Sequence, residues 1–225
     1  MSKYVMSDLH GCYEEFIKML ELIKFSDEDH LYILGDVIDR GPSSLKIIDY
    51  IVTKPNITLL LGNHEQMYVE WFETGYPYDW FSNGGDKTFE ELTTQKPIEF
   101  QYELYRYFRK LPRMIKVDKF ILVHAGIYLP SNYKEFTIDE LLKDQTLDYN
   151  IWGRSHVGKY YELPNDYKIV CGHTPVQNII NCEKPSDVQI VSHGSYIYID
   201  CGGVFKDSFG RHACLRLDDM EKFYV

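Results

Sequence analysis

Hydrophobic positions in the first third of the chain form short apolar runs that alternate with segments of helical periodicity. Residues 3–7, 31–34 and 57–61 are apolar runs of strand length, whereas residues 13–25 and 45–51 carry apolar side chains at helical spacing. This alternation predicts βαβ units and a largely parallel sheet. In such sheets the chemistry gathers in loops beyond the carboxyl ends of the strands.

The pattern changes between residues 75 and 111, which are crowded with aromatic side chains. We interpret this segment as a helical excursion or cap packed on the sheet, and its rings as the core of that cap. The aromatic residues are Tyr76, Tyr78, Trp80, Phe81, Phe89, Phe100, Tyr102, Tyr105, Tyr107 and Phe108.

Strand signals return in the second half of the chain. The apolar runs are residues 114–117, 120–124, 168–171, 189–191, 196–199 and 213–217. The later runs are short and closely spaced, which is typical of antiparallel hairpins that widen a sheet or add a second one. The length of 225 residues favours one domain over residues 1–225, with residues 75–111 as a cap inside it.

Composition narrows the class of protein. With 44% hydrophobic and 26% charged residues, the chain can bury a substantial core. The 24 basic and 34 acidic side chains give a net charge of −10, which disfavours nucleic-acid and membrane partners. Five scattered cysteines, together with the lack of a signal-peptide or membrane-spanning run, predict a reduced, soluble, cytoplasmic protein.

Five short polar motifs follow predicted strands, and each combines Asp, Asn or His with glycine. They are Asp8-Leu-His-Gly, Gly35-Asp-Val-Ile-Asp-Arg-Gly-Pro, Gly62-Asn-His-Glu, His124-Ala-Gly and Gly172-His-Thr-Pro. We expect them to converge on one sheet edge. A lone motif of this kind is a weak signal, because a single histidine is more often structural than a ligand. The occurrence of all five motifs in this order, each after a strand, is a strong signal.

These residue types suit a site for two metal ions. A carboxylate can bridge two divalent cations, and histidine nitrogen with asparagine oxygen favours Mn, Fe or Zn over Mg or Ca. In the Asp-x-His motif, the side chains of Asp8 and His10 are expected on the same side of an extended segment, where both can bind one ion. The sequence therefore predicts two divalent ions, with Mn²⁺ first among the candidates.

The ordered motifs, from Asp8 to His173, resemble those of the calcineurin-like metallophosphoesterases. Within this family, the chain is similar to the phosphoprotein phosphatase branch and its small bacterial and phage members. Residues 80–85 also resemble the corresponding segment of the small phage-type members. The resemblance implies an α/β fold in which central mixed β-sheets form a sandwich flanked by helices, with a small helical cap.

The resemblance also implies two metal sites that share one carboxylate. The first would be held by Asp8, His10 and Asp36. The second would be held by Asp36, Asn63, His124 and His173, with Asn63 also facing the substrate.

Four further residues receive roles from the same resemblance. Arg40 and Arg154 would bind the phosphoryl oxygens, since guanidinium groups donate in a planar, bidentate way. His64, oriented by Asp39, would protonate the leaving alkoxide. A hydroxide shared by the two cations would attack phosphorus in line, so no phosphoenzyme is needed and configuration at phosphorus should invert.

The resulting hypothesis is a two-metal phosphomonoester hydrolase, first of all a serine/threonine protein phosphatase acting on phosphorylated proteins, peptides or small phosphorylated substrates. The alternative is a hydrolase of dinucleoside polyphosphates, such as diadenosine tetraphosphate, or of another phosphoanhydride. Glu65 and the Asp39-Arg40 pair favour the protein phosphatase branch. A non-catalytic binding module is disfavoured, because such a chain should have lost ligands and this one keeps every expected position.

The sequence lacks the motifs of two other classes of phosphate-hydrolysing enzyme, the cysteine phosphatases and the phosphate-loop NTPases. A cysteine phosphatase needs Cys, five residues and then Arg, which none of the cysteines offers. The segment Gly84-Gly-Asp-Lys-Thr lacks the phosphate-loop spacing.

The remaining histidines lack sequence partners and are interpreted as surface or packing residues: His30, His156, His193 and His212.

Overall fold

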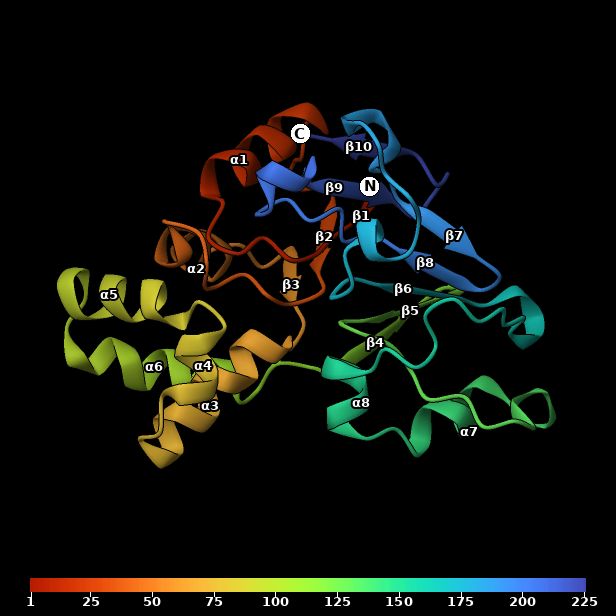
Figure 1. Cartoon of the computed structure of the whole chain (residues 1–225), viewed down its shortest axis with the longest axis horizontal. Coiled ribbons are helices and arrows are strands. Elements are labelled where there is room, and N and C mark those ends of the chain that lie inside the picture. The colour runs from red at the N-terminus through yellow and green to blue at the C-terminus, as the bar shows by residue number, and fades with distance from the viewer.

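The computed structural model describes all 225 residues and contains two five-stranded β-sheets flanked by helices (Figure 1). The first sheet has the order β10-β9-β1-β2-β3, in which β1, β2 and β3 are parallel, β9 is antiparallel to β1, and β10 is antiparallel to β9. Its strands are β1 (Lys3–Met6), β2 (His30–Ile33), β3 (Ile57–Leu59), β9 (Ala213–Arg216) and β10 (Lys222–Tyr224).

The second sheet has the order β4-β5-β6-β8-β7 and is also mixed. Its central strands β5, β6 and β8 are parallel, and its edge strands β4 and β7 are antiparallel to their neighbours. The strands are β4 (Met114–Val117), β5 (Phe120–Val123), β6 (Lys168–Cys171), β7 (Val191–His193) and β8 (Tyr196–Tyr198). The predicted α/β class with mixed, helix-flanked sheets is confirmed.

Helices connect the parallel strands and cover the outer face of the first sheet (Figure 1). The crossovers β1-α1-β2 and β2-α2-β3 are the βαβ units that the hydrophobic pattern predicts. The helices are α1 (Tyr13–Leu22), α2 (Ser44–Ile51), α3 (Asn63–Thr74), α4 (Tyr78–Ser82), α5 (Gly85–Gln95), α6 (Ile98–Phe108), α7 (Ile138–Lys143) and α8 (Leu147–Trp152). No helix has both the length and the apolar character that crossing a bilayer requires.

The two-residue period of strand β1 divides the hydrophobic interior into two cores. Val5 belongs to a core of 26 buried residues that combines side chains from both sheets. Tyr4 and Met6 point the other way, into a core of 24 buried residues shared with α1, α2 and the cap helices. All five cysteines are free; Cys171 is buried within β6, and Cys201 is buried shortly after β8.

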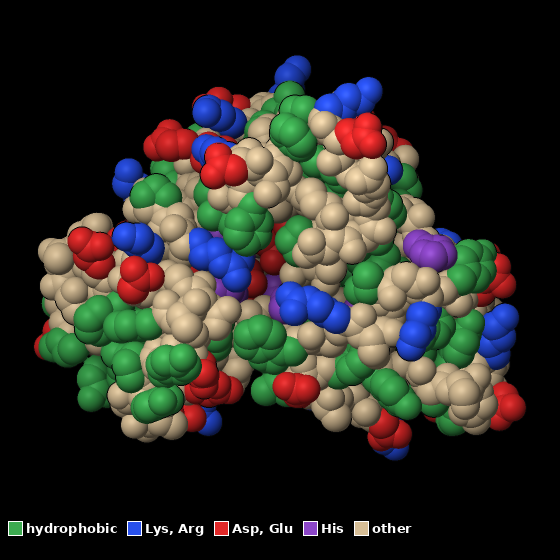
Figure 2. Space-filling model, in the orientation of Figure 1, with side chains coloured by type: hydrophobic (Ala, Val, Ile, Leu, Met, Phe, Trp, Pro, Cys, Tyr) green, Lys and Arg blue, Asp and Glu red, His purple; other side chains and the backbone are tan.

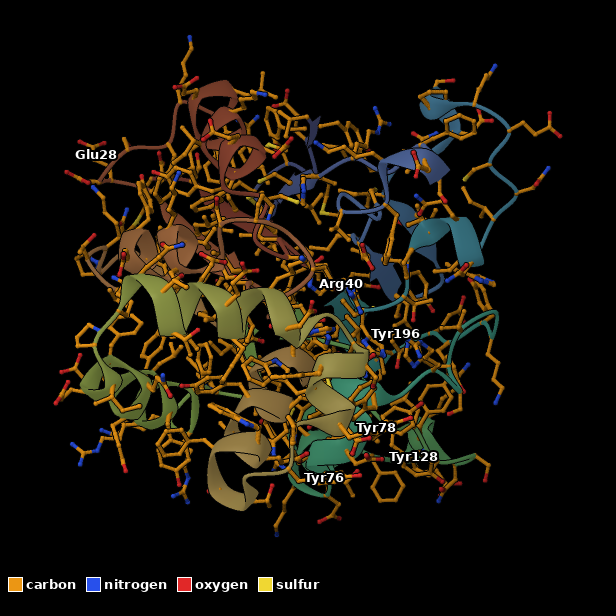
Figure 3. The ribbon with its side chains drawn as sticks, turned by 60° about the vertical axis from the view of Figure 1, so that its left-hand side comes forward. Glu28, Arg40, Tyr76, Tyr78, Tyr128 and Tyr196 are labelled. Atoms are coloured by element: carbon orange, nitrogen blue, oxygen red, sulfur yellow. The ribbon has the colours of Figure 1, made fainter.

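Helices α4, α5 and α6 occupy the aromatic segment and pack against α2 and α3. Trp80 is buried at the centre of this packing, with its ring centroid 4.9 Å from that of Trp71 and 5.3 Å from that of Tyr68. Residues 75–111 therefore form helices around an aromatic core, which is the arrangement that their aromatic composition predicts. Tyr76 and Tyr78, in contrast, project into solvent from the start of this segment (Figure 3).

Three expectations need correction. The five motif-bearing strand ends belong to two sheets rather than to one edge, because β5 and β6 pair in the second sheet. Asp8 and His10 have φ angles of 52° and 42°, so their segment is not extended. Strand β7 begins at Val191 rather than at residue 189, and β10 was not predicted, because its short run resembles a loop.

Candidate active site

Loops from both sheets meet at a cavity of about 250 Å³ on the molecular surface. In Figure 2, basic side chains lie on both sides of a central hollow in which acidic and histidine side chains are visible. Six of the residues lining this cavity come from the strand-end motifs: Asp8, His10, Asp36, Arg40, Asn63 and His173. The two sheets thus bring their polar loops to one place.

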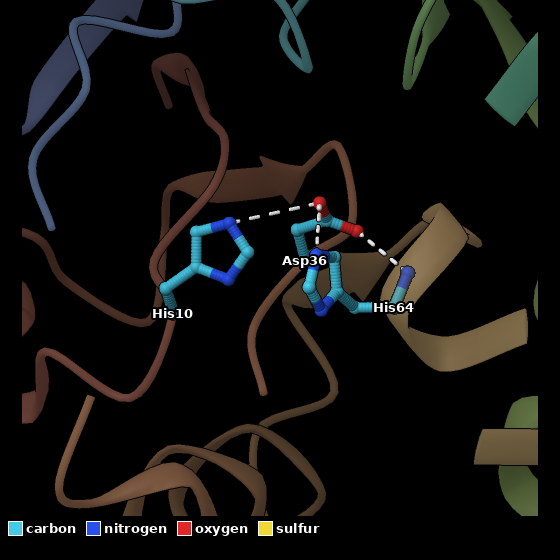
Figure 4. A group of neighbouring side chains, drawn as sticks. All are labelled: His10, Asp36 and His64. Carbon is cyan, nitrogen blue, oxygen red and sulfur yellow. Dashed lines mark hydrogen bonds and ion pairs between the residues drawn. The ribbon is translucent and has the colours of Figure 1, made fainter. Parts of the chain in front are cut away.

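Asp36, in the loop after β2, lies at the centre of the buried part of the site. Its Oδ2 is 3.7 Å from His10 Nε2, 3.8 Å from His64 Nε2 and 3.5 Å from His124 Nε2 (Figure 4 draws the first two). Burial, followed by the charges of Glu65 and Asp8, raises the pKa of Asp36 well above its usual range. A cation beside this carboxylate would remove that electrostatic cost.

The histidine tautomers follow from backbone carbonyl groups, which only accept hydrogen bonds. His10 Nδ1 donates to Ile38 O at 2.9 Å, and His124 Nδ1 donates to Leu34 O at 2.7 Å. Burial also lowers the pKa of both imidazoles, which favours their neutral forms. Each Nε2 therefore presents a lone pair toward Asp36, as metal-ligating histidines do.

Acceptor atoms face one another without a hydrogen between them. His124 Nε2, a lone-pair acceptor in this tautomer, lies 2.8 Å from Asn63 Oδ1, which also only accepts. His173 Nδ1 is 3.2 Å from His124 Nε2, and His173 Nε2 is buried without a partner. Neutral nitrogen and oxygen atoms whose lone pairs converge in this way fit the ligand set of a divalent cation.

The potential ligands form two overlapping groups around Asp36. Ligand atoms of His10, Asp36 and His64 lie within 4.8 Å of one another, as do those of Asp36, His124 and His173. The second group contains three of the four residues that the resemblance assigns to the second ion. The first contains His64 where Asp8 was expected, while Asp8 lies on the cavity wall and accepts the backbone N–H of His173 at 3.0 Å.

His64 is hydrogen-bonded to Asp39, the residue with which the family resemblance pairs it. His64 Nδ1 lies 2.7 Å from Asp39 Oδ2, both side chains are fully buried, and His64 Nε2 has no hydrogen-bond partner. Burial raises the pKa of Asp39 to about 7, against hydrogen bonds from Thr88 and Trp80 that favour its charged form. A carboxylate that holds Nδ1 fixes the ring, and the buried Nε2 then lies 3.8 Å from Asp36 Oδ2.

Arg40 and Arg154 line the cavity from different directions. Arg40 lies beside the start of α5 (Figure 3), where its backbone N–H donates to Gly84 O. Its guanidinium contacts His10 Nε2. Arg154, just after α8, donates from Nη2 to the backbone carbonyl of His173 at 3.4 Å. Two cationic groups thus flank the cluster that would hold the metals.

The backbone of these loops is strained in a way that only the folded protein can maintain. Non-glycine residues with left-handed φ angles concentrate at this site, at Asp8, His10, Asp36, Asp39, Arg40 and His173. Each such residue costs free energy that the surrounding structure must supply. Gly62 is required for a different reason, because a Cβ atom there would overlap Asp36 Oδ1.

Three polar groups of the site were not predicted. Asp200 lies on the cavity wall, and burial together with the charge of Asp8 raises its pKa well above the usual range. It directly follows the apolar run 196–199 and precedes Gly202, so the strand-end pattern could have identified it. Trp80 and Thr88 reach Asp39 from the cap, and no local signal identifies them.

The structure brings all the sequence-predicted site residues together: Asp8, His10, Asp36, Asp39, Arg40, Asn63, His64, His124, Arg154 and His173. Two of the remaining histidines are packing residues, as expected. His156 is buried and stacks on Tyr196 with ring centroids 4.4 Å apart, and His212 is buried as well.

Comparison with known sequences identifies relatives. A family model described as calcineurin-like phosphoesterase matches residues 1–202. A symmetrical bis(5'-nucleosyl)-tetraphosphatase of Buchnera aphidicola subsp. Acyrthosiphon pisum is 37% identical over 132 residues, which cover 56% of this chain and 45% of that enzyme. Serine/threonine-protein phosphatase 2 of Salmonella typhimurium is 34% identical over 147 residues, which cover 62% of this chain and 66% of that protein. The match thus spans about half the length of the tetraphosphatase relatives.

Solved structures support the same fold. A putative diadenosine tetraphosphatase superimposes with a TM-score of 0.68 at 17% identity, covering 100% of this chain and 92% of that one. A serine/threonine phosphatase from Saccharomyces cerevisiae superimposes with a TM-score of 0.61 at 17% identity, covering 100% and 79%. Together with the family match over residues 1–202, these likenesses show that the chain belongs to the calcineurin-like phosphoesterase family.

Proposed function

We propose that this chain is a two-metal phosphomonoester hydrolase that acts on phosphoserine and phosphothreonine in proteins or peptides. The observation that carries the proposal is the convergence of lone-pair donors on Asp36, where His124 Nε2 faces Asn63 Oδ1 at 2.8 Å. Such an arrangement is unfavourable in the bare protein and favourable around cations.

The donor set fits two divalent ions, first of all Mn²⁺, with Fe or Zn as alternatives. Asp8, His10 and Asp36 would hold one ion. Asp36, Asn63, His124 and His173 would hold the other. When bound, the ions would lower the pKa of water at the site and offset the negative charge of the phosphoryl group.

The remaining residues would bind the substrate and move a proton. Arg40 and Arg154, on the two sides of the cluster, would each donate to phosphoryl oxygens and hold phosphorus in line for attack. His64 would deliver a proton from Nε2 to the leaving oxygen. Asp39 would hold the ring through Nδ1 in the orientation that this transfer needs.

The size of the cavity supports a small reacting group on a large substrate. A cavity of about 250 Å³ lies below the range of ~300–1,000 Å³ that encloses a drug-sized ligand. A phosphoryl group with the first atoms of a side chain would fit, while the rest of a polypeptide would lie outside. The Salmonella protein phosphatase, matched over 66% of its length, supports the same class.

The second candidate is a hydrolase of dinucleoside polyphosphates. Its support is the tetraphosphatase relatives, together with two exposed aromatic side chains on the cavity wall, Trp152 and Phe205, which offer surfaces on which a base could stack. Phe205 also lies 5.5 Å from the guanidinium of Arg40, at the phosphoryl end of the cavity.

Parallel assays separate the two candidates. The wild-type protein loaded with Mn²⁺ is incubated with a phosphothreonine peptide, diadenosine tetraphosphate and p-nitrophenyl phosphate, with Asp36→Asn as the inactive control. Higher kcat/KM for the peptide supports the proposal, and a large preference for the dinucleotide overturns it in favour of the second candidate. Absence of turnover on all three substrates would overturn both.

A further inference from the structure

The Asp39–His64 pair receives its remaining side-chain hydrogen bonds from the cap. Trp80 Nε1, in α4, donates to Asp39 Oδ2 at 2.8 Å. Thr88 Oγ1, in α5, donates to Asp39 Oδ1 at 2.6 Å and accepts the backbone N–H of Asp39 at 2.9 Å. Two of the three side chains that donate to this carboxylate therefore lie 41 and 49 residues away from it in the sequence.

These contacts leave the carboxylate a single orientation. Asp39 has a left-handed backbone (φ 74°) and is fully buried, so neither water nor a relaxed loop conformation can replace its partners. Thr88 fixes one carboxylate oxygen and shares the backbone N–H of Asp39 with Ser44 Oγ. Trp80 shares the other oxygen with His64 Nδ1. The direction of the Asp39–His64 hydrogen bond is thus set by the cap.

The cap can hold this orientation because its donors are immobile. Trp80 is 1% exposed and packs edge-on against Tyr68, with ring centroids 5.3 Å apart and planes at 86°. Gly85, at the start of α5, lies directly against the indole, where a Cβ atom would overlap the ring. Rotation of Trp80 away from Asp39 would therefore require repacking of the aromatic core.

We propose that Trp80 and Thr88 are positioning residues for proton transfer, through which the helical cap aims His64 Nε2 at the leaving oxygen. This inference rests on the proposed function. In the step concerned, an oxygen derived from water bonds to phosphorus as the P–O bond to the leaving group breaks, and the electron pair of the broken bond stays on the leaving oxygen. The Nε2–H bond of the imidazolium breaks as the new O–H bond forms, which leaves a neutral imidazole. The cap would thus serve the chemical step as well as the packing of the protein.

The test compares variants that differ by one hydrogen-bonding group. Thr88→Val removes the hydroxyl at nearly constant shape, and Thr88→Ser keeps it. Trp80→Phe removes the indole N–H, and its control is Trp71→Phe in the same aromatic cluster, since no hydrogen bond joins Trp71 to Asp39. Turnover is measured on glycerol 2-phosphate, whose alkoxide needs a proton, and on p-nitrophenyl phosphate, whose phenolate scarcely needs one.

We expect Thr88→Val and Trp80→Phe to lower kcat about tenfold or more on glycerol 2-phosphate and less than threefold on p-nitrophenyl phosphate. Thr88→Ser should restore most of the loss, and Trp71→Phe should affect both substrates alike. Equal losses on the two substrates in Thr88→Val and Trp80→Phe, with an active wild type, would overturn this inference and leave the proposed function intact.

A second measurement needs no turnover. In the metal-free protein, the proton on His64 Nδ1, bonded to a buried carboxylate, should give a low-field ¹H resonance that disappears in His64→Asn. We expect this resonance to shift in Thr88→Val and Trp80→Phe and to stay in place in Trp71→Phe. An unchanged resonance in both cap variants would show that Asp39 holds its orientation without them, whether or not the wild type hydrolyses phosphate esters.

Discussion

Glu65 Oε2 accepts the backbone N–H of Asp36 at 2.8 Å, which ties the first turn of α3 to the loop after β2. The same carboxylate accepts the backbone N–H groups of Val37 at 2.9 Å and Gly62 at 3.0 Å. Glu65 is fully buried and lies two residues from Asn63. It therefore sets the spacing between two segments that would hold the metals, and it belongs to neither group of potential ligands.

Replacement of Glu65 by Gln should destabilise the protein by about 1–3 kcal/mol, because the amide NH₂ would face backbone N–H groups that lose their acceptor. Urea unfolding in EDTA measures the loss. Metal affinity should fall at least tenfold, as it does when residues that orient ligands are lost. Glu70→Gln, on the exposed side of the same helix, is the matched control and should stay within ~0.5 kcal/mol. Equal stability of the two variants would contradict the structural role.

Asp36→Asn should make the metal-free protein more stable while removing metal binding. The folded pKa of Asp36 is raised, so its ionisation opposes folding as pH rises above the usual carboxyl pKa. We expect a gain in stability at pH 7 in EDTA that shrinks toward pH 4, where the carboxyl group is protonated in the unfolded chain as well. Denaturant titrations at both pH values and metal analysis test this prediction. A variant that binds two ions, or that is less stable without metal, would contradict it.

His64→Asn distinguishes a proton donor from a metal ligand, since His64 Nε2 also lies 3.8 Å from Asp36 Oδ2. As a general acid, the residue should leave the metal content at two ions per chain while turnover of alkyl phosphates falls about 10²–10⁴-fold. The loss on p-nitrophenyl phosphate should be much smaller. Metal analysis showing one ion per chain would instead assign His64 as a ligand.

Acid should unfold the protein partly through His156 and His212. Burial lowers the pKa of each to about 4, below the ordinary value of 6.5, so the folded state binds fewer protons than the unfolded chain in that interval. Stability is therefore complete above about pH 6.5 and is lost as pH falls toward 4, by ~1.4 kcal/mol per pH unit for each residue. His156→Phe, which keeps the stacking on Tyr196, should reduce this slope. An unaltered slope would exclude His156 as a contributor.

Removal of metal should abolish activity. Prolonged EDTA treatment is expected to stop turnover, with Mn²⁺ restoring it better than Mg²⁺ or Ca²⁺, because the donor set is rich in imidazole nitrogen. The melting temperature should rise as Mn²⁺ is added back, since the ions bind the folded state. Activity that survives complete chelation would contradict the metal assignment.

The sequence by itself determined the features that depend on local patterns. Alternating apolar runs and helical spacing predicted the β1-α1-β2-α2-β3 units, because side-chain periodicity reports the secondary structure within a segment. Polar motifs with glycine at strand ends located the site residues apart from Arg154, which came from the family resemblance, and the crowded aromatic residues located the cap. The same rule, applied after residue 199, would also have found Asp200.

Only the tertiary structure decided how these pieces meet. It placed the motif-bearing strand ends on two sheets, gave Asp8 and His10 left-handed backbone angles, and set Trp80 and Thr88 against Asp39. None of these relationships leaves a periodic signal, because each joins residues far apart in the chain or depends on strain that the packed structure maintains. Local sequence patterns were enough to identify candidate residues, whereas the tertiary packing determined which of them are in contact.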